Sequence, residues 1–72
     1  MKREAVESSN MAEIGYDPKK TLLEVLFHNG AIYQYHPFTE EQHKEMLAAD
    51  SIGKWFWANV RGNESIKLKR MN

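Results

Sequence analysis

The sequence predicts an α+β domain in which a three-stranded antiparallel meander is followed by two helices packed on one face of the sheet. Three observations predict it. The alternation from Leu23 to Phe27 around Glu24 has the period of a half-buried strand. Asn29-Gly30 is the strongest short signal for a hairpin turn. Two capped apolar repeats then occupy residues 39–62 and have the period of helices.

The strands are expected at Met11–Tyr16, Thr21–His28 and Ala31–His36. Asp17-Pro18-Lys19-Lys20 separates the first two and should form a turn, because proline presets φ at the second turn position. Residues 1–7 are polar and lack periodicity, so they are expected to form a flexible N-terminal segment.

The first helix is expected at Glu40–Ala49, where Thr39 and Gln42 have the spacing of a capping box. Glu40 and Glu41 lie in its first turn, where the helix dipole favours acidic side chains. Its inward stripe is expected to comprise His43, Met46 and Leu47.

The second helix is expected at Ile52–Arg61, with Ser51 as its N-cap and Gly62 ending it. Its buried seam is expected to comprise Ile52, Phe56 and Val60, which recur every four residues.

The domain is expected to span residues 8–62, followed by a basic C-terminal tail over residues 63–72. In that tail, Ile66 and Leu68 alternate with Lys67 and Lys69. The alternation is compatible with a short edge strand or with a loose basic tail, and the loose tail is preferred.

Size and composition bound the function. The chain has 72 residues, zero formal net charge and no cysteine. One small core and a reducing cytoplasmic location are therefore expected. No apolar run approaches the roughly 20 residues of a membrane span, so no membrane association is expected. The balanced charge argues against a polycation built for nonspecific DNA binding.

The hairpin register decides which face the tyrosines share. A two-residue Asn29-Gly30 loop would place Tyr33 and Tyr35 opposite the apolar face of the preceding strand. A three-residue loop, with Gly30 in a bulge, would place them on that apolar face. The second register separates polar from apolar residues better and is preferred. The rings would then be partly core, although exposed rings on a sheet could instead stack nucleobases.

The chain contains an ordered series of short motifs: Ser8-Ser9-Asn10, Gly15-Tyr16-Asp17, Leu23-x-Val25-x-Phe27, Asn29-Gly30-x-x-Tyr33-x-Tyr35, Ser51-x-Gly53 and Phe56-x-x-Asn59-Val60-Arg61. In the order and spacing of these motifs it resembles the KTSC domain family. The family is named for its occurrence at the C-terminus of some lysyl-tRNA synthetases, and it also forms small stand-alone bacterial and phage proteins. That context implies RNA binding. Position 57, commonly asparagine in the family, is Trp57 here.

The second helix presents a candidate nucleic-acid surface. Lys54 and Arg61 are the i−3 and i+4 neighbours of Trp57, so one face carries a large ring between two cations. Phosphates would meet the cations while bases stack on the ring. Tyr33 and Tyr35 are candidate additional contacts. The simpler interpretation is that Trp57 packs against the tail or the sheet edge and that the cations are only solvated.

Ser51 and Gly53, at the start of that helix, form a weaker candidate anion site. The preferred interpretation is that Ser51 caps the helix and that Gly53 permits close packing. His28, His36 and His43 fall on three different elements without the spacing of a metal motif, so no metal, cofactor or catalytic residue is expected.

Two functions are therefore considered. The first is a non-enzymatic accessory module that binds RNA or single-stranded nucleic acid through Lys54, Trp57, Arg61, Tyr33 and Tyr35. The alternative is a protein-interaction module, of bacterial or phage origin, that uses the edge or the second face of the sheet. That second face would carry Leu26, Ile32, Gln34 and His36.

Overall fold

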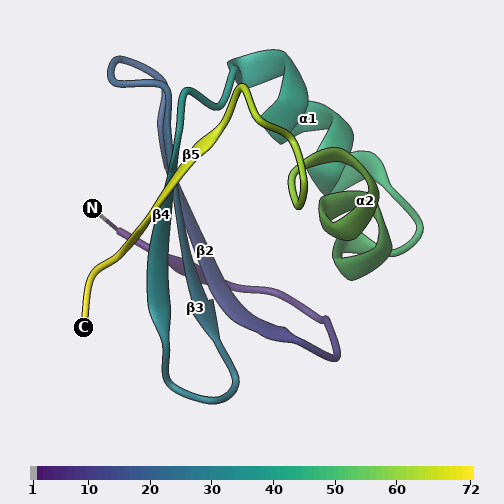
Figure 1. Cartoon of the computed structure of the whole chain (residues 1–72). Coiled ribbons are helices and arrows are strands. Elements are labelled where there is room, and N and C mark those ends of the chain that lie inside the picture. The colour runs from purple at the N-terminus through teal and green to yellow at the C-terminus, as the bar shows by residue number, and fades with distance from the viewer. Residues whose placement is uncertain (1) are drawn as a thin grey trace.

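The computed structural model describes residues 2–72 and confirms the α+β class. Five antiparallel strands follow one another across the sheet in chain order, and two helices cover one side of it (Figure 1). The strands are β1 (Glu4–Ala5), β2 (Met11–Asp17), β3 (Leu22–Phe27), β4 (Ile32–His36) and β5 (Lys67–Arg70). The helices are α1 (Glu40–Ala48) and α2 (Ile52–Asn59).

The expectation of three strands is wrong at both ends of the sheet. Glu4–Ala5, in the segment expected to be flexible, pairs with β2 as strand β1. The residues expected to form a loose tail instead form β5, which pairs with β4 in the register Tyr35↔Leu68. Pairing satisfies backbone groups at the edge of β4, and Ile66 is buried in the core just before β5 begins. Both facts favour an ordered C-terminal strand over a loose tail.

The preferred hairpin register is confirmed. Val25 lies opposite Tyr33, and the Phe27 amide donates to the Ala31 carbonyl at 2.9 Å. His28, Asn29 and Gly30 therefore form a three-residue loop, in which Gly30 has a φ of +89°. This positive φ is costly for residues that carry a Cβ. The register places Tyr33 and Tyr35 on the same face as Val25.

Local capping signals position both helices. The Thr39 hydroxyl accepts from the Gln42 amide, and the Gln42 side chain accepts from the Thr39 amide, so the capping box is formed. The Ser51 hydroxyl accepts from the Lys54 amide at 3.2 Å and caps α2.

The inward face of α1 differs in part from the expected stripe. Met46 is fully buried, but Leu47 is 51% exposed, so placing Leu47 in the core was wrong. Successive helix positions are separated by about 100°, so a nine-residue helix that buries Met46 turns Leu47 outward. His43 stacks on Tyr16 with ring centroids 4.4 Å apart. Burial lowers the pKa of His43, although the nearby Glu40 opposes the shift.

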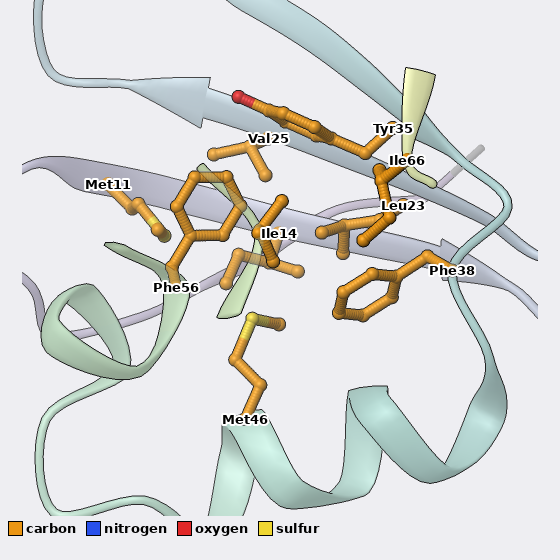
Figure 2. Close-up of a cluster of buried hydrophobic side chains, with 10 residues drawn as sticks. Met11, Ile14, Leu23, Val25, Tyr35, Phe38, Met46, Phe56 and Ile66 are labelled. Atoms are coloured by element: carbon orange, nitrogen blue, oxygen red, sulfur yellow. The ribbon is translucent and has the colours of Figure 1, made fainter. Parts of the chain in front are cut away.

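The core lies between the inner face of the sheet and the two helices (Figure 2). Phe56 of α2 and Met46 of α1 point toward Leu23 and Val25 of the sheet. Phe38 lies in the connection from β4 to α1 and is fully buried. Its carbonyl accepts from the Tyr16 hydroxyl at 2.6 Å, which fixes this connection to β2.

Candidate groove between α2 and the sheet

A groove of about 880 Å³ lies between α2 and the hairpin end of the sheet. The hairpin side is contributed by Phe27, His28 and Asn29, and Tyr33 and Tyr35 of β4 lie beside them. The opposite wall comes from α2 and the turn that follows it. The β3–β4 hairpin extends beyond the helices at this end of the sheet (Figure 1).

Aromatic rings form the floor of the groove. The Tyr35 and Phe56 rings meet edge to face at 5.0 Å between centroids. Phe27 contacts Tyr33 at 5.7 Å and Phe56 at 6.2 Å in the same arrangement. Such edge-to-face contacts stabilise the floor beyond simple area burial. The floor is therefore continuous with the core, to which Tyr35 and Phe56 belong and against which Phe27 and Tyr33 pack.

The rim carries an exposed ring covered by a cation. Trp57 is 59% exposed, and the Arg61 guanidinium carbon lies 4.0 Å from its ring centroid. This is close to the geometry expected of a cation–π contact. A second guanidinium, that of Arg70 on β5, lies 5.9 Å from the Tyr33 ring centroid. Two cation–aromatic pairs thus flank the groove.

Several polar atoms on these rings are free. The Tyr33 and Tyr35 hydroxyls and the Trp57 indole N–H make no hydrogen bond to residues 2–72. The Tyr35 ring lies within the core cluster with its hydroxyl oxygen at the cluster's edge (Figure 2). Burial raises the pKa of Tyr35 to about 12; Tyr33 adds to the rise and Arg61 opposes it. Tyr35 is therefore a neutral hydrogen-bonding group at physiological pH.

The electrostatic character of the groove differs from that of the whole chain. The protein has ten carboxylates balanced by ten lysines and arginines. None of those carboxylates lines the groove, whereas Arg61 does. Arg61 also makes no salt bridge to the described residues. A neutral protein thus presents one aromatic surface suited to an anionic ligand.

Comparison with known proteins identifies the family. The model of the KTSC domain matches residues 7–63, most of the chain. The chain belongs to the KTSC domain family. An uncharacterized protein from Stutzerimonas stutzeri is 45% identical over 56 residues, which cover 78% of this chain and 79% of that protein. A protein from Tsukamurella paurometabola is 40% identical over 50 residues, or 69% of this chain and 75% of that protein.

The fold agrees with a solved structure of the same family. The crystal structure of a KTSC domain protein from Yersinia pestis superposes with a TM-score of 0.91 at 31% identity. The match covers 99% of this chain and 97% of that one, so it includes both edge strands. The Yersinia pestis protein therefore shares the fold of this chain over nearly its whole length.

Four of the five residues expected from the sequence to contact nucleic acid lie in the groove of this KTSC domain. Tyr33, Tyr35, Trp57 and Arg61 all line the groove. Lys54 is exposed on α2 but does not line it. The register and the helix crossing together place the tyrosines opposite Trp57, which the spacing of residues on one helix cannot show.

The weaker anion site at the start of α2 is not built. The Ser51 hydroxyl is occupied as the N-cap acceptor. A Cβ added to Gly53 would lie 3.2 Å from the Ser8 hydroxyl, so this glycine permits the close approach of the chain before β2. The packing interpretation of Ser51 and Gly53 fits this geometry.

Sequence reasoning missed several lining residues. Leu68 enters the groove from β5, and Asn10 and His28 enter from the loops beside the hairpin. The alternation of the C-terminal residues was the one signal that could have placed Leu68.

No cluster of three histidine or carboxylate side chains suited to a metal occurs within residues 2–72. In the same part of the chain, neither helix has the length and apolar content needed to cross a bilayer.

Proposed function

We propose that this KTSC domain is a non-enzymatic accessory module that binds single-stranded nucleic acid, RNA in particular, in the groove between α2 and the sheet. One observation carries the proposal. The exposed Trp57 ring and the Arg61 guanidinium line the same groove as Tyr33 and Tyr35. No carboxylate lines that groove among the described residues. Proteins that hold unpaired strands combine stacking rings with cations in the same way.

The energetics favour an unpaired strand. Stacking of one base on an aromatic side chain contributes about 1–3 kcal/mol. An arginine contributes a planar stacking surface as well as donors to phosphate. In a base-paired duplex the faces of the bases are already stacked on one another, so the rings of the groove could not reach them.

The outer face of the sheet offers less support for the alternative, a protein-interaction surface. Glu24 there is bonded to Arg3 and to Gln34, so polar side chains interrupt the face beside Leu26 and Ile32. Both apolar side chains are half-buried. The structural observations therefore favour the groove.

A heteronuclear NMR titration with short single-stranded RNA tests the proposal. The chain contains an internal control, because Trp55 packs edge to face on Phe38 at 6.1 Å and does not line the groove. The Trp57 indole signal and the Tyr33 and Arg61 amides should shift, while the Trp55 indole signal stays in place. Unchanged spectra at millimolar RNA and low salt, or shifts confined to the outer face, would reject the proposal.

Two substitutions separate stacking from charge. Trp57→Ala should weaken binding by about 1–3 kcal/mol. Arg61→Gln should reduce the magnitude of the salt slope by about 0.7, because one phosphate contact is lost. Lys54→Gln is the matched control, since it removes one positive charge from α2 outside the groove, whereas Arg61 lies in the turn that follows α2. Equal effects of Lys54→Gln and Arg61→Gln would show that the groove is not the binding site.

A further inference from the structure

We infer that the groove holds unpaired nucleotides mainly by stacking and discriminates little among U, C and A. This inference rests on the proposed function and specifies the ligand class of the same site. It follows from which polar groups of the groove remain available to a ligand.

Two of the three asparagines that line the groove hold the fold together through their side chains. The Asn29 carboxamide oxygen accepts from the Ala31 amide at 3.0 Å within the hairpin loop. The Asn63 carboxamide accepts from the Ser65 amide and donates to the Asn59 carbonyl, so both of its ends are engaged. Bidentate recognition of a base by an amide side chain needs both ends free. Neither side chain meets that condition.

The histidine of the hairpin is also partly committed. Nε2 of His28 bonds to the Ser8 carbonyl oxygen at 2.9 Å and links the hairpin to the chain before β2. Only one ring nitrogen is left for a ligand. Asn10 is the one lining asparagine whose side chain makes no hydrogen bond to residues 2–72.

Apart from Asn10 and the Arg61 guanidinium, which can pair with base edges, the groups that remain free differ little in their affinity for the bases. They are the Tyr33 ring, the face of Trp57 that Arg61 does not cover, the Tyr33 and Tyr35 hydroxyls and the Trp57 indole N–H. A hydroxyl both donates and accepts, and an indole donates to any acceptor on a base, sugar or phosphate. Every base has a π face, so stacking tolerates all sequences.

The charge near the groove is small. Arg61 lines it, and Arg70 flanks it over Tyr33. If both neutralise phosphate, the logarithm of the affinity should fall with the logarithm of salt with a slope of about −1.4, at about −0.7 for each contact. That corresponds to a loss of about sevenfold between about 50 and about 200 mM salt.

Fluorescence anisotropy with the full chain and short labelled homopolymers of U, C and A tests the inference. The affinities should agree within about tenfold, the salt slope should be near −1.4, and a perfectly paired RNA hairpin with a minimal loop should bind more weakly than each homopolymer. Trp57→Ala should weaken all three homopolymers by about 5- to 150-fold. Asn10→Ala removes the one asparagine carboxamide of the groove that makes no hydrogen bond to residues 2–72. It should change the relative affinities of the homopolymers by less than about threefold.

Different failures have different meanings. A homopolymer preference much above tenfold that Asn10→Ala abolishes would overturn the inference and leave the proposed function standing. A much steeper slope would do the same, because charge and not stacking would then dominate. Tighter binding of the hairpin than of every homopolymer would overturn the proposed function as well, because that function requires an unpaired strand. Absence of binding to every RNA at low salt would overturn the inference together with the proposed function.

Discussion

The Arg3 guanidinium donates to the Glu24 carboxylate at 2.6 Å and so links the N-terminal edge of the sheet to its central strand. The register explains how it reaches. Glu4 pairs with Ile14, so Arg3 lies opposite Gly15, and Gly15 pairs with Glu24. Gln34 completes the cluster from β4 by donating to Glu24 at 2.9 Å.

This cluster predicts a contribution to acid stability. Burial alone would raise the pKa of Glu24, but the hydrogen bonds from Gln34 and Arg3 and the charge of Arg3 lower it overall. The stability contributed by the ionised form is therefore fully present above the ordinary carboxyl pKa of about 4.5. It is lost as the pH falls through the lowered pKa of the folded state.

Glu24→Gln should accordingly lower the free energy of unfolding near neutral pH by about 1 kcal/mol. It should also reduce the loss of stability below pH about 4.5, because a glutamine at position 24 does not take up a proton in that range. Urea unfolding at a series of pH values measures both. Parallel pH profiles for the variant and the wild type would contradict the assignment.

Phe56→Ala should destabilise the domain by about 3–5 kcal/mol, the range for truncation of a buried aromatic side chain. Phe56 is 3% exposed and contacts both Phe27 and Tyr35. Leu47→Ala is the matched control in the neighbouring helix, because Leu47 is half exposed and should cost less than about 1 kcal/mol. Thermal or chemical unfolding ranks the two variants; similar losses would place Leu47 in the core.

The raised pKa of Tyr35 predicts that the domain loses stability at alkaline pH. Its pKa is raised to about 12 from an ordinary value near 10, so the unfolded chain loses this proton first as the pH rises. The stability contribution is full below pH about 10 and is lost between about 10 and 12. Tyr35→Phe should keep the ring contacts and remove this part of the alkaline loss. Unfolding curves that weaken equally in both proteins over that range would refute the prediction.

Truncation after Gly62 should weaken the fold as well as RNA binding. It removes β5 and the buried Ile66, whose side-chain burial alone contributes about 1.5–3 kcal/mol. Arg70→Gln is the milder control, since it keeps β5 and removes only the guanidinium beside Tyr33. The truncated chain should unfold at a lower denaturant concentration than Arg70→Gln. Equal midpoints for both would show that β5 contributes nothing to the core.

The predictable parts of the fold are those set by local chemistry. Thr39, Ser51 and the loop at Gly30 act within a few residues of themselves, so the helix starts and the hairpin register could be predicted. The edge strands could not, because Glu4–Ala5 and Lys67–Arg70 are short and each depends on a partner strand far away in the chain.

The candidate site shows the same division. Trp57 and Arg61 are four residues apart, so their contact could be anticipated from the helical spacing expected there, although α2 ends at Asn59 and Arg61 lies in the turn that follows. The approach of Tyr33 and Tyr35 to Trp57 depends on how α2 crosses the sheet, and the spacing of residues in the sequence contains no signal for it. Lys54 has the right spacing but lies outside the groove for the same reason.

The strand order has a consequence for the timing of folding. Strands β2, β3 and β4 each pair with the element just before them, whereas α1 and α2 separate β5 from its partner β4 in the sequence. Early loops close at lower entropic cost than the long one that returns β5 to the sheet. We expect nascent chains to complete the meander first and to leave the β4 edge open until the last residues have been synthesised. Pulse-labelled hydrogen exchange would then show the amides that pair with β5 becoming protected after those shared by β2 and β3.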